Sequence, residues 1–181
     1  DPSQVGTPHT VRLIPADGAP IRVLDAEPRE YTGLAWSADG KRVAALTTEQ
    51  SLSMTNRLEV VDVATGKRWN AAPDLDRMMS SFVWTSDSQG LIALFRHRTR
   101  TRIVRFRAGG GAEADLGLTG RAALAPLTLD RAGRRLAFNS STDREPNDPT
   151  VFDLESSTLR PATRLNPQVA SWKPGREEAV I

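Results

Sequence analysis

Short apolar segments alternate with polar, glycine-containing turns along the whole of this chain. The apolar segments are rich in Val, Ile, Leu, Ala and Phe, as β-strands are. Apolar residues show no sustained helical period of about 3.6 residues, so we expect little helix. The pattern therefore predicts an all-β protein.

The strongest feature is a repeated pair of strands. Each copy has an apolar or Trp-containing strand, a tight polar turn and a second apolar strand, and the copies span residues 34–46, 82–94, 127–138 and 169–181. Four equivalent positions lie 48, 45 and 43 residues apart: Trp36, Trp84, Leu129 and Trp172. A repeat of about 45 residues made of short strands is typical of a propeller blade, which is a four-stranded antiparallel sheet. We therefore predict a partial β-propeller of successive four-stranded blades.

The rest of each period supplies two more strands. Third strands are expected at 58–63, 101–106 and 150–154, and short fourth strands around 67–69, 112–116 and 159–162. Residues 11–24 match strands three and four of an earlier blade, joined at Asp17-Gly18. The predicted division is 1–24 as the end of an upstream blade, 25–69, 70–116 and 117–165 as blades, and 166–181 as the start of a closing blade or the lead-in to another domain. We interpret the chain, which does not begin with Met, as a fragment.

The second strands are apolar on both faces. Strand alternation places Val43 and Ala45 on one face and Ala44 and Leu46 on the other, so both faces must be covered by neighbouring blades. We expect the three Trp residues of the repeat to lie in the core between blades. An arc of blades leaves an apolar face open at its end, so we also expect the isolated chain to self-associate or to be less stable than a longer protein.

No pattern of catalytic, cofactor-binding or metal-binding residues emerges. The chain has no Cys, and its two His residues, His9 and His97, lie far apart, whereas a zinc site needs three or four ligands. The Gly-x-Ser-x-Gly elbow of a hydrolase nucleophile does not occur in the sequence. Residues 109–111 are three Gly without the Lys-Ser/Thr of a phosphate-binding loop, so we interpret them as a blade turn. We assign no site residue and expect no cofactor.

Repeated carboxylates have two interpretations. Three Asp residues recur beside the hairpin turns: Asp39, Asp87 and Asp130. One interpretation is that they are repeated calcium ligands. Asp side chains also accept hydrogen bonds from the backbone of their own turn, and we favour this second interpretation. Glu177 and Glu178 are neighbours on an expected strand and therefore point to opposite faces, so we do not expect them to share acid–base chemistry.

The charge balance does not indicate nucleic-acid binding. The net charge is only +2. The sequence pI of about 9.5 arises because few groups titrate between neutral pH and pH 10, since only 3 of the 24 basic residues are Lys. One interpretation of the Arg-rich run 96–107 is that it binds a phosphate backbone or an acidic substrate. We favour the interpretation that it spans the turn between two strands, with Arg102 and Arg105 in solvent. No segment has the roughly 18–20 apolar residues of a membrane-spanning helix.

Several segments resemble known repeats. Residues 36–44, Trp-Ser-Ala-Asp-Gly-Lys-Arg-Val-Ala, resemble the repeat of TolB-like propellers and of the propeller domain of prolyl oligopeptidase family serine peptidases. Residues 138–154 resemble the closing blade of the bacterial enzymes of that family. Residues 159–168 are similar to the stretch before the peptidase domain, with Ala162 where Leu is usual, and 175–181 resemble the strand that enters that domain.

The resemblance implies a parent enzyme in which a propeller covers an α/β-hydrolase domain and admits short peptides. The implied partners are that hydrolase domain and the peptide substrate, with no nucleic acid and no membrane insertion. None of the catalytic triad maps onto this chain, and neither does the Glu pair with which some family members hold the substrate amino terminus. A TolB-like module that acts through protein–protein contacts remains the alternative, and the compartment, cytoplasmic or periplasmic, stays open.

Overall fold

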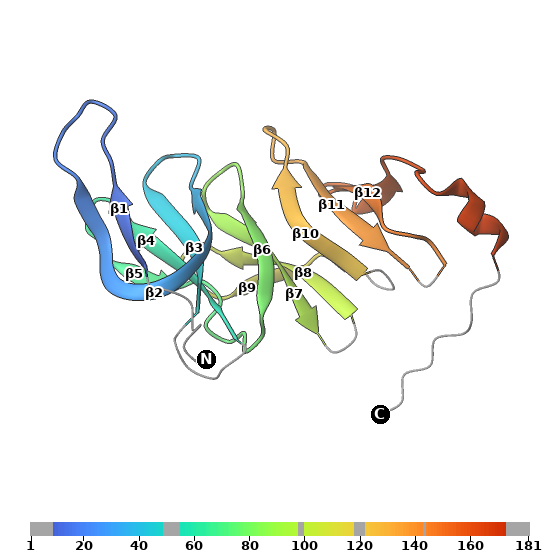
Figure 1. The fold of residues 1–181 in the computed structure, drawn as a ribbon, viewed down its shortest axis with the longest axis horizontal. Coiled ribbons are helices and arrows are strands. Elements are labelled where there is room, and N and C mark those ends of the chain that lie inside the picture. The colour runs from blue at the N-terminus through green and yellow to red at the C-terminus, as the bar shows by residue number, and fades with distance from the viewer. Residues whose placement is uncertain (1–8, 49–54, 98–99, 118–121, 143, 173–181) are drawn as a thin grey trace, which may run out of the picture.

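Three antiparallel sheets stand side by side along an arc in the computed structural model (Figure 1). The structure describes residues 9–48, 55–97, 100–117, 122–142 and 144–172. Within these ranges the only helix is the short 3-10 helix η1 (Pro167–Ser171), and no helix has the length and apolarity of a membrane span. The prediction of an all-β partial propeller is confirmed.

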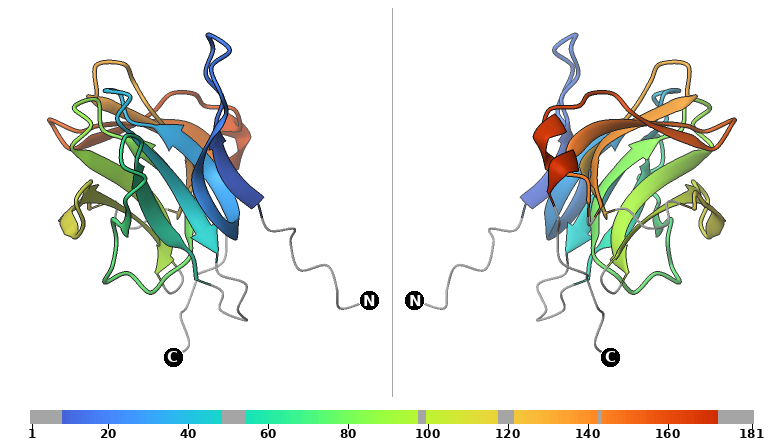
Figure 2. Two further views of the ribbon diagram at one scale, coloured as in Figure 1. Left: turned by 90° about the vertical axis from the view of Figure 1, so that its left-hand side faces the viewer. Right: turned by 90° about the vertical axis from the view of Figure 1, so that its right-hand side faces the viewer.

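The first sheet is curled on itself. Its five strands follow in chain order: β1 (His9–Leu13), β2 (Arg22–Trp36), β3 (Arg42–Thr48), β4 (Arg57–Asp62) and β5 (Arg68–Asn70). The first half of β2 pairs with β1 and its second half pairs with β3. The β1–β2 hairpin, with Gly18 at a positive φ in its turn, therefore folds over β3 and β4 (Figure 2).

The second and third sheets are four-stranded meanders. The second contains β6 (Met79–Trp84), β7 (Gly90–His97), β8 (Arg100–Arg107) and β9 (Ala112–Asp115). The third contains β10 (Ala122–Leu129), β11 (Arg135–Ser141), β12 (Asp148–Asp153) and β13 (Thr158–Pro161). The division of the whole chain into blades at 24, 69, 116 and 165 stays a prediction.

Strand register makes the three sheets equivalent. At the end of the first strand of the repeat, the cross-strand pairs are Trp36 with Val43, Trp84 with Leu91 and Leu129 with Leu136. A tight turn follows each pair. Positions in one sheet can therefore be compared directly with the same positions in the next.

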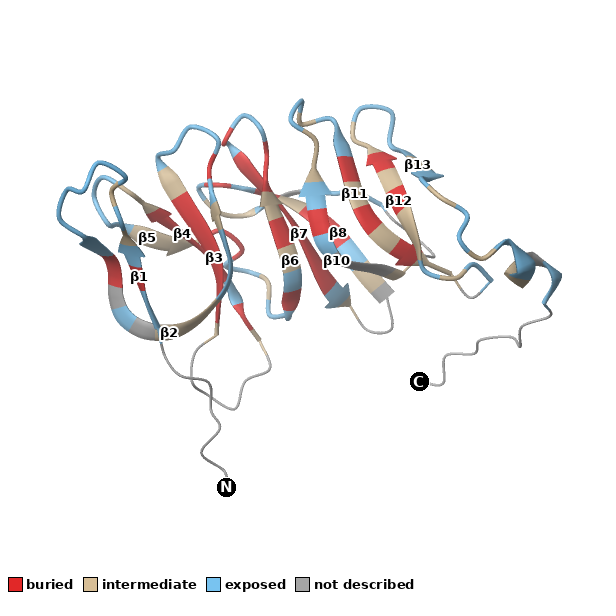
Figure 3. Ribbon diagram, turned by 45° about the horizontal axis from the view of Figure 1, so that its top comes forward, coloured by how far each residue is buried: buried red, intermediate tan, exposed pale blue. Residues whose placement is uncertain are grey.

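Both faces of the second strands β3 and β7 are covered, whereas β11 is fully buried on one face only. All five residues 43–47 of β3 are buried, as the alternation of apolar residues predicts (Figure 3). One core cluster joins the first sheet to the second and includes Leu58, Trp84 and Phe106, and another joins the second to the third and includes Ile92 and Phe138. The sheets are held together by these apolar layers.

Two Trp residues contradict the prediction that all three lie in the core. Trp84 is 8% exposed, packs on the first sheet and donates a hydrogen bond of 3.0 Å from Nε1 to the Ala35 carbonyl oxygen. Trp36 has the equivalent register but is 54% exposed, because only the β1–β2 hairpin lies on its side of the sheet. Trp172 follows η1, is 64% exposed and belongs to no strand of the described residues.

Candidate functional site

The turns after the first strand of each repeat meet across the sheets. Ser88 accepts a hydrogen bond of 3.0 Å at Oγ from the backbone N–H of Asp39 in the preceding sheet. Gly133 of the third sheet lies so close to Ser86 that a Cβ at position 133 would come within 2.8 Å of the Ser86 Cβ. These contacts fix one end of the gap between each pair of neighbouring sheets.

The recurring carboxylates stabilise their own turns. Asp39 and Asp87 each accept a hydrogen bond from the backbone N–H two residues later, at 3.1 and 2.9 Å. Asp130 accepts from Arg134 and Arg135 and occupies the position held by Ser37 in the first sheet. Hydrogen bonds from the Arg135 and Arg134 backbone lower the pKa of Asp130. The structure thus supports the turn interpretation over the calcium interpretation.

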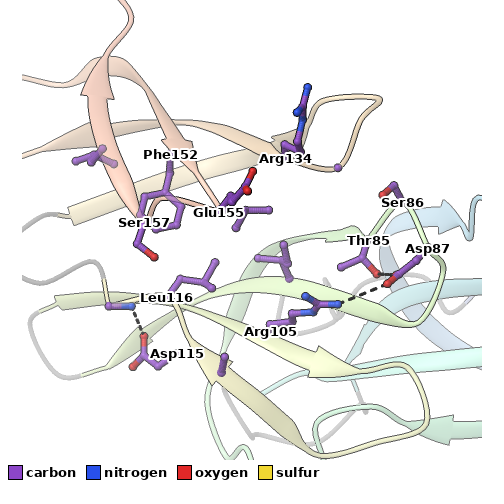
Figure 4. A pocket seen from close by; sticks show the side chains of 16 residues that line it. Thr85, Ser86, Asp87, Arg105, Asp115, Leu116, Arg134, Phe152, Glu155 and Ser157 are labelled. Atoms are coloured by element: carbon purple, nitrogen blue, oxygen red, sulfur yellow. Dashed lines mark hydrogen bonds and ion pairs between the residues drawn. The ribbon is translucent and has the colours of Figure 1, made fainter.

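A cleft of about 900 Å³ opens between the second and third sheets (Figure 4). Its lining combines apolar side chains with hydroxyl, carboxylate and guanidinium groups. One wall comes from β7, β8 and β9 with the turn after β6, and the other from β12 and β13 with the turns at Gly133 and Glu155. Among the lining residues are Ile92, Arg105, Ala114, Leu116, Phe152 and Leu154.

Charged pairs border the cleft. Arg105 lies 3.7 Å from Asp87 on the wall that the second sheet provides, and the Thr85 hydroxyl donates to Asp87 Oδ1 at 2.5 Å. The bond from Thr85, then that from the Gln89 backbone, lowers the pKa of Asp87. Partial burial opposes ionisation of Asp115, but hydrogen bonds from the Gly117 backbone and from Arg102 outweigh it and lower the pKa of Asp115. Both carboxylates are therefore ionised at neutral pH.

A second charged cluster joins the β1–β2 hairpin to β4 and β5. Arg68 contacts Asp25 at 2.9 Å and also pairs with Glu27. Tyr31 donates a hydrogen bond of 2.6 Å to Asp25, which is buried. Hydrogen bonds from Arg68 and Arg29 lower the pKa of Glu27 to about 2. The cluster ties distant segments of the chain together.

The remaining candidates from the sequence are scattered. His9 begins β1 and is exposed, and His97 ends β7, at the far end of the second sheet. Arg102 lies exposed in β8, as the turn interpretation of the Arg run predicts, but it pairs with Asp115, and Arg105 is half-buried at the cleft. Glu177 and Glu178 lie outside the described residues.

The last two interpretations from the sequence concern metal ligands and the three consecutive Gly. Within the described residues, no three His, Asp or Glu side chains gather into a cluster that would hold a metal ion. The glycines of residues 109–111 form the turn between β8 and β9, with Gly110 and Gly111 at positive φ, as interpreted from the sequence. The sequence did not predict the cleft, because it lies between two sheets, or the charged cluster, because its members lie up to 43 residues apart in the chain.

The comparisons with known proteins agree with the fold. The sequence matches no protein-family model and no curated protein sequence. A putative TolB from Agrobacterium tumefaciens superposes with a TM-score of 0.65 at 14% identity, over 84% of this chain and 55% of that protein. A puromycin-hydrolysing peptidase from Mycobacterium tuberculosis gives 0.64 at 19% identity, over 81% of this chain and 23% of that protein.

A structure from a study of two prolyl endopeptidases gives a TM-score of 0.58 at 17% identity, over 80% of this chain and 24% of that protein. The chain therefore spans about half the length of the TolB protein and about a quarter of each peptidase. At these identities the likeness shows a shared propeller fold.

Proposed function

We propose that residues 1–181 are the propeller portion of a serine peptidase that resembles the prolyl oligopeptidase family. In this proposal they control the access of short peptides to a hydrolase domain outside these residues. The shared fold of the puromycin-hydrolysing peptidase and the prolyl endopeptidase supports it, as does the resemblance of residues 138–168 to the end of the family's propeller.

The observation that carries the proposal is the outer face of the third sheet. Thr128, Ala137 and Asn139 of this sheet take the positions that Val83, Ile92 and Leu94 hold in the second sheet. Those second-sheet residues pack against the third sheet, whereas their counterparts are polar or small and none is fully buried. A further sheet of the same kind would bury little apolar surface here, as at the terminal repeat of a stacked array. This supports the proposal that a domain of another kind, rather than a further sheet, follows the third sheet.

The protein that carries these residues in nature provides the test. We expect it to cleave short fluorogenic peptides and to leave a folded protein substrate intact, because a propeller cover excludes large substrates. The matched control is residues 1–181 alone, which should cleave neither. Cleavage of folded protein at the same rate as short peptides would contradict access control, and no cleavage of any substrate would contradict the peptidase assignment.

A TolB-like binding module is the second candidate. This chain covers 55% of the TolB protein, against 23% of the puromycin-hydrolysing peptidase, at similar TM-scores of 0.65 and 0.64. On this alternative the natural protein forms a stable complex with another protein and contains no hydrolase domain. The sequence that follows Ile181 in nature discriminates, since a Gly-x-Ser-x-Gly elbow there decides for the peptidase.

A further inference from the structure

The gap between the first and second sheets is filled by an indole. Trp69 on β5 pairs with Val60 on β4, and the two side chains belong to the core shared with the second sheet. The Trp69 Nε1 donates a hydrogen bond of 2.6 Å to the carbonyl oxygen of Ala108, which follows β8. Trp69 therefore fastens the outer edge of the first sheet to the second.

The same position in the next gap holds an alanine. Ala114 on β9 pairs with Arg105 on β8 as Trp69 pairs with Val60, and the registers of the inner strands make the two pairs equivalent. A methyl group thus replaces an indole, and a guanidinium replaces a buried isopropyl group. The cleft of about 900 Å³ lies at this position, lined by both Ala114 and Arg105.

The opposite wall of the cleft keeps the features that receive Trp69 in the first gap. Phe152 pairs with Leu136 as Phe106 pairs with Leu91, so Phe152 presents its ring where Phe106 presents one to the first gap. Leu154 takes the place of Ala108. The Leu154 N–H donates to the carbonyl of Arg134, as the Ala108 N–H donates to the equivalent carbonyl of Gln89. The cleft therefore has the wall for an aromatic side chain but lacks the side chain.

We propose that this cleft binds a Trp or Tyr side chain presented by a partner polypeptide. The ring lies over Ala114 and against Leu116 and Phe152, and its N–H or O–H points to the carbonyl of Leu154, as Trp69 does to Ala108. The Arg105 guanidinium at the mouth favours an aromatic face over an aliphatic chain through a cation–π contact. The volume lies within the range of ligand pockets, so the flanking backbone of the partner also has room. The inference goes beyond the proposed function and does not depend on it.

Titration of the isolated chain with N-acetyl-L-tryptophanamide tests the proposal. We expect amide chemical-shift changes in the two-dimensional NMR spectrum at Ala114, Leu116 and Phe152, similar changes with N-acetyl-L-tyrosinamide, and a Kd at least about tenfold weaker for N-acetyl-L-leucinamide. Shifts confined to other sheets, or equal affinity for the leucine compound, would overturn it.

Two variants make the test specific. Ala114→Trp supplies the missing indole from the chain itself, so it should weaken binding of the tryptophan compound by about tenfold or more. Ala16→Trp, in the exposed β1–β2 turn, is the matched control and should bind as the unaltered chain does. Unchanged binding by a folded Ala114→Trp protein would contradict the proposal.

The reverse substitution covers the case in which Ala114→Trp does not fold. Trp69→Ala should open an equivalent cleft in the first gap and create a second binding event, seen as added shift changes at Ala71, Ala108 and Gly111, which surround Trp69 or follow its strand. A Trp69→Ala protein that binds the tryptophan compound only as the unaltered chain does would show that the vacated indole position has no affinity for an aromatic ring.

Discussion

The fourth residue after the repeat position shows how single residues set the contact between sheets. Gly40, Ser88 and Gly133 occupy it, all in the left-handed region with φ of 68°, 59° and 71°. This region is strained for residues with a Cβ. Ser88 adopts this conformation although it has a Cβ. Its buried hydroxyl accepts a hydrogen bond from the backbone N–H of Asp39 in the neighbouring turn, and this bond joins the first sheet to the second.

Comparison of two glycine substitutions separates backbone strain from packing. Gly40→Ala should cost about 1 kcal/mol of unfolding free energy, since a Cβ there meets nothing within 4 Å. Gly133→Ala should cost about 2–4 kcal/mol, because the added Cβ also overlaps Ser86 of the second sheet. Urea denaturation measures both. Equal losses would mean that the second and third sheets do not touch at this turn.

At the scale of elements, a charged network joins the curled strand β2 to β4 and β5, beside the apolar cluster that lies under the β1–β2 hairpin. The bend brings Asp25, Glu27 and Arg29 to β4 and β5, where Arg68 pairs with the first two and Glu59 lies 3.4 Å from Arg29. Burial raises the pKa of Glu59, and Arg29 opposes the shift. A partly buried network of this kind loses stability when one partner is removed, because the others stay desolvated.

Arg68→Gln should therefore destabilise the chain by about 1–3 kcal/mol at neutral pH. The pKa values of Asp25 and Glu27, that of Glu27 about 2, lie below those of the unfolded chain. The stabilising contribution of these two carboxylates is therefore present above about pH 4–5 and is lost as the pH falls towards about 2. Without Arg68 these values rise towards the unfolded ones, so unfolding free energy should depend less on pH in this window. Glu59 acts oppositely, because its raised pKa lowers stability as the pH rises between its unfolded and folded values.

Arg102→Gln is the matched control for this measurement. Arg102 pairs with Asp115 at the surface, where an ion pair contributes about 0–1 kcal/mol. Denaturation curves at several pH values compare the two variants. If both lose the same stability with the same pH dependence, the network does not hold the curl of β2.

The sequence predicted the strands better than their assembly. Alternation and turn residues located the strand pairs of the three described sheets, because these signals lie within a few residues of one another. The fourth pair predicted over 169–181 is wrong at its start, since residues 169–171 belong to the 3-10 helix η1, and residues 173–181 lie outside the described residues. β2 was missed as one continuous strand, because the partners of its polar middle, such as Arg68 for Asp25, lie 43 residues away in the chain. The cleft was missed because it depends on Ala114 having the same register as Trp69, which only the pairing of the strands reveals.

At the scale of the whole molecule, the two ends of the arc differ. The outer face of the third sheet carries the polar or small residues Thr128, Ala137 and Asn139 beside the half-buried Val151. By contrast, large apolar side chains are exposed on the first sheet, at Leu34 and Trp36, and on its hairpin, at Ile14, Ile21 and Val23. Large exposed apolar side chains are typical of contact surfaces when they gather on one part of a molecule. The first end of the arc is therefore the one suited to cover by another apolar sheet face.

We expect this face to cause self-association of the isolated chain. Sedimentation velocity at increasing concentration should show dimers or larger species, and Trp36→Glu should shift the population towards the monomer. Met78→Glu replaces an exposed apolar residue outside this face and should have little effect. A chain that stays monomeric at every concentration would contradict the prediction.

Labelling by an active-site-directed fluorophosphonate tests the central proposal most directly. The probe reacts with a Ser that is activated by a His base beside an oxyanion hole, and no such Ser was predicted within residues 1–181. We predict that the natural protein containing these residues is labelled on one Ser outside them, while the isolated chain stays unlabelled. A folded natural protein that the probe leaves unlabelled would contradict the peptidase assignment and favour the binding module.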